Sequence, residues 1–133
     1  NELMNTFNYQ EVFDRVVNHF AAQGRPARLG SCKYRLQYQD EILSCAIGCL
    51  IDDANYDESL ENSTVLSNKT ADAVAKSLDC EISAHNQEFL YDLQAIHDAP
   101  ANVDSLKKGL TQLAARYQLD PSQVDNITTW TSL

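Results

Sequence analysis

The four cysteines are the residues whose type most readily suggests chemistry. They are Cys32, Cys45, Cys49 and Cys80, and His85 follows the last of them by five residues. A structural zinc site normally takes its ligands as two close pairs. In an extended strand Cys45 and Cys49 would lie about 13 Å apart on one face, too far to share an ion. The spacing therefore predicts no metal site, and we expect no cofactor.

The same thiols offer two other kinds of chemistry. Cys32 and Cys49 would meet if a hairpin extended that far, but a reducing cytosol would keep a disulfide between them open. A nucleophile would need Cys45 or Cys49 beside His85 or His97 in the fold. Because apolar surroundings raise the pKa of a thiol, we expect buried and unreactive thiols instead.

An acidic segment begins like a calcium-binding loop. It runs from Asp53 to Asp57. Glu58 stands where such a loop needs Gly, and Thr64 stands where it needs a bidentate Glu. We expect a solvated acidic surface here and no calcium site.

Arg35 and His97 are more promising charged side chains. Arg35 lies on the polar face of a predicted strand, close to the acidic segment, where an ion pair with Asp52 or Asp53 would stiffen the chain. Its guanidinium would serve equally as one wall of an anion-binding pocket. His97 closes a predicted helix, where the negative end of the helix dipole favours the imidazolium.

Composition limits the classes of function. The 133 residues are 44% hydrophobic and carry a net charge of −9, which predicts one domain over residues 1–133. No basic stripe is present to bind a phosphate backbone directly, and no apolar run is long enough to cross a membrane. We interpret residues 1–3 as an expression remnant before a native Met4, and expect a cytoplasmic protein.

Two kinds of periodicity indicate the elements that would position these residues. Apolar residues from Phe7 to Phe20 recur at helical spacing between a cap at Asn8 and a stop at Gly24. Residues 32–38 and 43–49 alternate as two strands of a hairpin. With Asp40 and Glu41 as the turn, Tyr38 faces Leu43, Leu36 faces Cys45, Tyr34 faces Ile47 and Cys32 faces Cys49.

Further helices are predicted downstream. They span residues 71–78 with Thr70 as cap, residues 86–97, and a stripe from Val103 to Tyr117 with Asn102 as cap. A helical turn near residues 57–62 and a short last helix at Asp120-Pro121 complete the pattern. The sequence thus predicts a mainly helical α+β domain, with about five helices around one hairpin.

The central segment resembles a motif of small uncharacterised bacterial proteins found in phage-type regions and mobile integron cassettes. The matching residues are Tyr34, Arg35, Asp40, Cys45, Ala46, Ile47, Gly48, Cys49, Leu50, Ile51, Asp52 and Tyr56. The segment FLYDLQAIHDAP and the closing ARYQLDPS extend the likeness over Phe13 to about Val124, and Glu41 departs from it by replacing a turn Gly. The resemblance implies a single bacterial domain with no assigned activity. It points to Tyr34, Arg35, Asp52, Tyr56 and His97 as candidate ligand-binding residues and assigns none of them a catalytic role.

Three functions fit these observations. The favoured one is a non-enzymatic accessory protein that binds a protein partner or a small ligand, as a homo-oligomer, because the apolar tail with Trp130 needs a surface to dock on. The second is a small enzyme in which Arg35 holds an anionic substrate and His97 or Asp52 moves protons. The third is an acidic mimic of nucleic acid, aimed at a DNA-binding protein.

Overall fold

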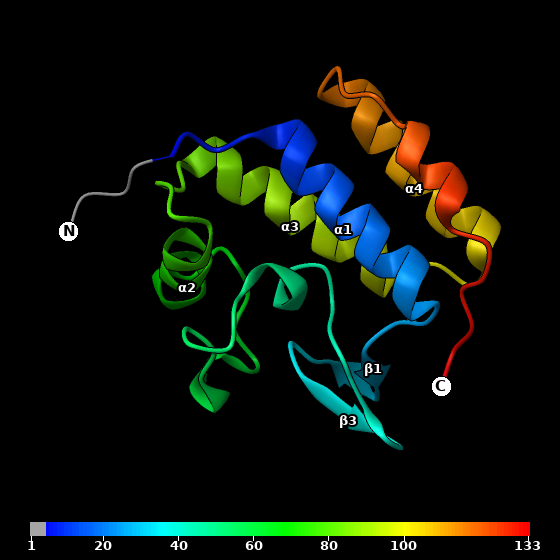
Figure 1. Ribbon diagram of the computed structural model, residues 1–133, viewed down its shortest axis with the longest axis horizontal. Helices are drawn as coiled ribbons and strands as arrows, with labels where there is room; N and C mark the ends of the chain where they lie inside the picture. Colours follow the sequence, from blue (N-terminus) through cyan, green and yellow to red (C-terminus); the bar gives the residue numbers. More distant parts are fainter. Residues whose placement is uncertain (1–4) are drawn as a thin grey trace.

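Helices dominate the architecture of the computed structural model, which describes residues 5–133 (Figure 1). Within these residues there are four α-helices, α1 (Tyr9–Gln23), α2 (Asn68–Leu78), α3 (Ala84–Asp98) and α4 (Val103–Arg116). Three short 3-10 helices are η1 (Gly48–Leu50), η2 (Glu58–Leu60) and η3 (Ser122–Asn126). The predicted α+β class is confirmed, and the count of about five helices is corrected to four. The interpretation of residues 1–3 lies outside the described residues.

Helices α1 and α3 run side by side in the same direction through the middle of the molecule (Figure 1). Tyr9 at the start of α1 contacts Phe89 near the start of α3, and Phe20 at the other end contacts His97. Helix α4 packs against α3, and η3 closes over both α1 and α4. No helix in residues 5–133 is both long enough and apolar enough to cross a bilayer.

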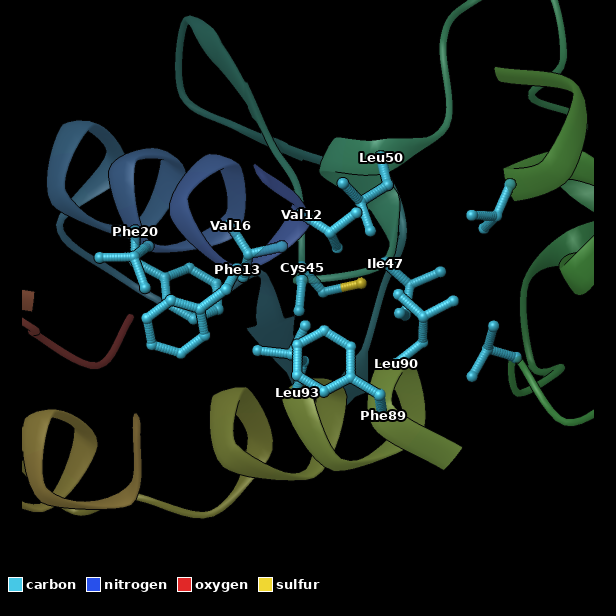
Figure 2. Close-up of a cluster of buried hydrophobic side chains, with 14 of the residues drawn as sticks. Val12, Phe13, Val16, Phe20, Cys45, Ile47, Leu50, Phe89, Leu90 and Leu93 are labelled. Carbon is cyan, nitrogen blue, oxygen red and sulfur yellow. The ribbon is translucent and has the colours of Figure 1, made fainter. Parts of the chain in front are cut away.

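The core lies between α1, α3 and the segment around η1 (Figure 2). Phe13 and Phe20 from α1 and Phe89 from α3 are fully buried, together with Ile47 and Leu50. Each such side chain contributes about 1.5–3 kcal/mol through burial. Cys45 lies among them in Figure 2, as a small apolar member of the core.

Local signals set the ends of the helices. Asn8 caps α1 by accepting from the Glu11 N–H, and Gly24 ends it at a φ of 71°. Asn102 caps α4 as predicted. The cap of α2 is Ser67 and not Thr70, because the Ser67 hydroxyl accepts from the Thr70 N–H and so moves the start of the helix three residues earlier.

The predicted register of the hairpin is wrong. Strands β3 (Leu36–Tyr38) and β4 (Glu41–Leu43) pair Leu36 with Leu43 and Tyr38 with Glu41, so the turn is Gln39-Asp40. Gln39 adopts a φ of 53°, the left-handed conformation that a tight turn requires. Relative to the prediction the pairing shifts by two residues, which keeps every side chain on its predicted face.

The chain leaves the hairpin after Leu43 and becomes helical. The Cys49 N–H donates to the Cys45 carbonyl at 3.0 Å, and η1 follows. Gly48 allows this close turn, since a Cβ there would overlap the Tyr34 carbonyl. The predicted pairings of Leu36, Tyr34 and Cys32 with Cys45, Ile47 and Cys49 are therefore all wrong.

A second, smaller hairpin precedes the predicted one. Strand β1 (Arg28–Leu29) pairs with β2 (Ser31–Cys32) around Gly30, whose φ is 78°. Cys32 thus faces Arg28, and all four cysteines are free thiols. The sequence predicted a strand beginning at Cys32 but none over residues 28–31, because two-residue strands are too short to show an alternating pattern.

The tail docks on its own chain. Trp130 is buried, with its ring 5.1 Å from that of Phe20 and 5.7 Å from that of His97. The predicted short last helix is present as η3. Because the tail already has a surface to cover, it no longer supplies a reason for a homo-oligomer.

Candidate functional site

Two polar clusters lie on either side of Tyr34. The Arg35 cluster consists of Arg35, Tyr56 and Glu61 with the backbone groups that they bind. The Asp98 cluster consists of Cys32, Gln94, His97 and Asp98. Of the predicted site residues, the first contains Arg35 and Tyr56 and binds the backbone of Tyr34, and the second contains His97.

Arg35 is held by carbonyl groups of the protein itself. Its Nη1 donates to the Gly48 carbonyl and its Nη2 to the Ile51 carbonyl, both at 2.6 Å. The guanidinium lies 4.8 Å from the centre of the Tyr56 ring and 3.4 Å from the exposed carboxylate of Asp53. Arg35 therefore supplies a donor to the Ile51 carbonyl and a second donor to the Gly48 carbonyl, which also accepts from the Ile51 N–H.

Glu61 completes this cluster from the other side. Its Oε1 accepts from the Tyr34 N–H at 3.0 Å, and its Oε2 accepts from the Arg35 N–H at 3.1 Å and the Tyr56 hydroxyl at 2.7 Å. Burial and the Glu61 carboxylate raise the pKa of Tyr56 to about 12, so its hydroxyl remains a donor. Both carboxylate oxygens of Glu61 are thus occupied.

Asp52 lies next to the Arg35 cluster without joining it. Its Oδ1 accepts from the backbone and side-chain nitrogens of Asn55, at 3.1 and 2.7 Å, and Arg35 pairs with Asp53 instead. The structure thus brings Tyr34, Arg35 and Tyr56 together, leaves Asp52 at their side, and places His97 in the other cluster.

The Asp98 cluster is built at the end of α3. One oxygen of Asp98, Oδ1, accepts three hydrogen bonds of 2.7 Å, from the Cys32 thiol, the Gln94 amide and His97 Nδ1. Burial by itself would raise the pKa of Asp98, but these hydrogen bonds outweigh it and lower the pKa. The carboxylate is consequently charged at neutral pH.

His97 is fixed as a neutral tautomer by its two neighbours. Its fully buried ring accepts from the Ala27 N–H at Nε2, at 3.1 Å, so Nδ1 carries the hydrogen that it donates to Asp98. An imidazolium would place two donors against each other at Ala27. The expected helix-dipole charge at His97 is therefore replaced by a neutral hydrogen-bonded ring.

The ligand atoms of Cys32, His97 and Asp98 lie within 4.8 Å of one another, which is the spacing of a metal site. The hydrogen bonds argue against that use. A histidine that binds a metal through Nδ1 keeps its hydrogen on Nε2 and donates it to an acceptor. Here Nε2 faces the Ala27 N–H, a donor, so the donor set does not fit a metal.

Nor is Cys32 arranged as a nucleophile. Its thiol contacts the Asp98 carboxylate and not the imidazole, whereas an activated cysteine pairs with a base that removes its proton. Burial and the nearby carboxylate raise the pKa of Cys32 to about 12. Burial likewise raises the pKa of Cys45, and that of Cys49 to about 12.

A cavity of about 450 Å³ opens beside this cluster, and we call it the Asp98 cavity. It is lined by Ser31, Cys32, Lys33, Tyr34, Cys45, Glu61, Asn62, Ser63, Thr64, Tyr91, Gln94, Ala95 and Asp98. A smaller hollow of about 260 Å³ touches His97 and Asp98 from another side, next to Arg28 and Leu133. Of the predicted residues, only Tyr34 lines the Asp98 cavity.

Sequence reasoning missed Asp98, Gln94 and the role of Cys32. Gln94 and Asp98 are four residues apart on one helix face, which is a recognisable local signal. Cys32 is 66 residues away from Asp98, and no local pattern connects the two.

Comparison of the chain with protein-family models, with curated proteins and with solved structures finds no match. The likeness to integron-cassette proteins accordingly stays a prediction, and the site is interpreted from its own geometry.

Proposed function

We propose that this protein is a small-molecule-binding module, an accessory protein and not an enzyme, whose ligand occupies the Asp98 cavity. A positively charged group of the ligand binds the Asp98 carboxylate. This is the small-ligand form of the function that the sequence favoured, moved to a site that the sequence did not indicate.

The observation that supports the proposal is the uneven use of the Asp98 carboxylate. All three of its hydrogen bonds within the described residues end on Oδ1, which leaves Oδ2 for another donor. The side chain is 35% exposed and lines a cavity of a size typical for small ligands. A charged acceptor held in place by three donors is preorganised for a cation.

Binding fits this site better than catalysis does. Cys32 is held as a thiol by its raised pKa, and both ring nitrogens of His97 are engaged. A general acid or base needs a proton that can move in the working pH range. The enzyme hypothesis therefore lacks a residue in this cluster to carry it.

A cytoplasmic setting is part of the proposal, and four unpaired cysteines agree with a reducing compartment. Self-association remains a separate prediction. With Trp130 buried, it depends on other apolar surface, such as Leu29 and Ile42, each 62% exposed on the hairpins. The native mass of the protein in solution is the direct measurement.

The test uses isoamylamine as a simple cationic probe, titrated against the protein and followed by amide chemical shifts. We expect shifts at residues lining the Asp98 cavity and a dissociation constant at least about tenfold weaker in Asp98→Asn, since a charge-assisted hydrogen bond is lost. Glu88→Gln is the matched control, because it removes one exposed carboxylate from the same helix. A thermal melt of each variant confirms that it is folded under the conditions of the titration.

Either of two results would contradict the proposal. One is equal binding of isoamylamine to the wild type and to folded Asp98→Asn. The other is a set of shifts that maps to acidic surface elsewhere, such as Asp52 and Asp53.

A further inference from the structure

We propose that the ligand of the Asp98 cavity is a zwitterion of amino-acid size, whose carboxylate binds Lys33 while its ammonium group binds Asp98. This inference rests on the proposed function and adds a second charged contact to it. Asp98 alone would accept any cation, whereas the two residues together define a class of ligand.

Lys33 is a second charged side chain of the cavity, and its ammonium group has no partner among the residues that the structure describes. Its ammonium group forms no hydrogen bond or ion pair within residues 5–133, although the side chain is half-buried and lines the cavity. Its backbone is well anchored, because the Lys33 N–H donates to the Ala27 carbonyl at 2.9 Å. The side chain thus starts from a fixed position at the cavity wall.

The carboxylates near Lys33 are not used to neutralise it. Both oxygens of Glu61 are occupied by the backbone of Tyr34 and Arg35 and by Tyr56. Asp98 accepts its hydrogen bonds from Cys32, Gln94 and His97, and it forms no ion pair with Lys33 within 4.0 Å. A cation alone would therefore enter beside an unneutralised ammonium group, whereas a zwitterion would satisfy both charges.

The rest of the cavity favours an apolar side chain on the ligand. Tyr34 and Cys45 form a buried part of its lining, and Tyr91, a residue that is 42% exposed, also lines it. Burial raises the pKa of Tyr34 to about 12 and keeps Cys45 a neutral thiol, so neither adds charge. The chemistry expected is two opposite charges at one end of the ligand and a hydrocarbon group at the other.

The experiment compares three probes that share one hydrocarbon group. L-Leucine carries both charges, isoamylamine lacks the carboxylate, and 4-methylpentanoate lacks the ammonium group. We expect L-leucine to bind about threefold to tenfold more tightly than isoamylamine, as a part-exposed ion pair would contribute. We expect 4-methylpentanoate to bind weakest, because its carboxylate would lie near Asp98.

Lys33→Gln is the decisive variant, since Lys33 takes no part in the Asp98 hydrogen bonds and the substitution leaves them in place. It should weaken L-leucine to the level of isoamylamine and leave isoamylamine unchanged or slightly tighter. Lys108→Gln, at an exposed position on α4, is the matched control and should change neither.

The outcomes separate this inference from the proposed function. If isoamylamine binds in an Asp98-dependent way but L-leucine binds no tighter, or Lys33→Gln has no effect on L-leucine, the zwitterion inference is overturned and the binding site stands. If neither amine binds at the cavity, or if Asp98→Asn changes nothing, both are overturned.

Discussion

The Arg35 cluster and the Asp98 cluster are built from similar parts and differ in what remains unpaired. Each combines a partly buried charged side chain with hydrogen bonds to the backbone. In the Arg35 cluster both terminal guanidinium nitrogens and both oxygens of Glu61 have protein partners. In the Asp98 cluster, Asp98 Oδ2 and the neighbouring Lys33 have none within the described residues.

This difference separates a structural network from a candidate binding site. A charge whose partners are all supplied by the fold stabilises the fold, and a ligand would have to displace those partners. A charge that is held in place on one side and free on the other is available to a ligand at little cost in reorganisation. The residues around Arg35, which the sequence singles out as ligand-binding candidates, thus belong to the structural network.

The largest expected effect is a loss of stability when the Arg35 cluster is disrupted. Arg35→Met keeps the apolar stem of the side chain but removes the donor to the Ile51 carbonyl and one of the two donors to the Gly48 carbonyl. We expect the free energy of unfolding to fall by about 2–4 kcal/mol, because partly buried carbonyls lose charged hydrogen bonds. Urea denaturation measures this loss.

The matched control for Arg35→Met is Arg116→Met, which removes an exposed pair of 3.7 Å with Asp92 and should cost less than about 1 kcal/mol. The distinction between the clusters would break down if Arg35→Met were equally mild. It would also break down if folded Arg35→Met no longer bound isoamylamine.

A smaller effect concerns pH and the histidine beside the Arg35 cluster. His19 donates from Nε2 to the Ser44 carbonyl at 2.8 Å, and burial lowers its pKa below 6.5. The unfolded chain therefore binds a proton at His19 more readily than the folded chain does. His19 contributes to the free energy of unfolding above pH 6.5, and this contribution is lost as the pH falls through the folded pKa.

The measurement is unfolding free energy against pH in the wild type and in His19→Gln. We expect the wild type to lose stability more steeply than the variant below pH 6.5. Parallel curves for the two proteins would show that His19 does not titrate in this way.

The smallest effect is spectroscopic and involves no loss of stability. His97 accepts at Nε2 and His19 donates from Nε2, so at neutral or higher pH the two rings should be opposite tautomers. Nitrogen chemical shifts of the two imidazoles report this directly, with the hydrogen expected on Nδ1 of His97. A hydrogen on Nε2 of His97 would reopen the metal interpretation of Cys32, His97 and Asp98.

The elements could be predicted from the sequence to the extent that local contacts define them. Helix α1 follows from apolar spacing between Asn8 and Gly24, and both caps act within four residues. The register of β3 and β4 was missed because a shift of two residues leaves the alternation of faces unchanged. The observed register places the turn at Gln39-Asp40, where Gln39 adopts a positive φ that the sequence pattern does not reveal.

The candidate site was predicted only where the expected hairpin brings two segments together. Arg35 and Asp53 are 18 residues apart, and the expected hairpin placed Arg35 near the acidic segment that contains Asp53. Lys33 was passed over because a single lysine on a predicted strand has no pattern that marks it as a binding residue.

By itself the sequence determined the α+β class, the positions of the main helices and the apolar faces that they bury, because these depend on periodicity and on neighbours a few residues apart. Only the tertiary structure decided which charges are left unpaired. Whether Asp98 is a buried structural group or an open acceptor depends on Cys32, on Ala27 acting through His97, and on the shape of the cavity between them. Those contacts join segments about 70 residues apart, where packing and not local pattern determines which atoms meet.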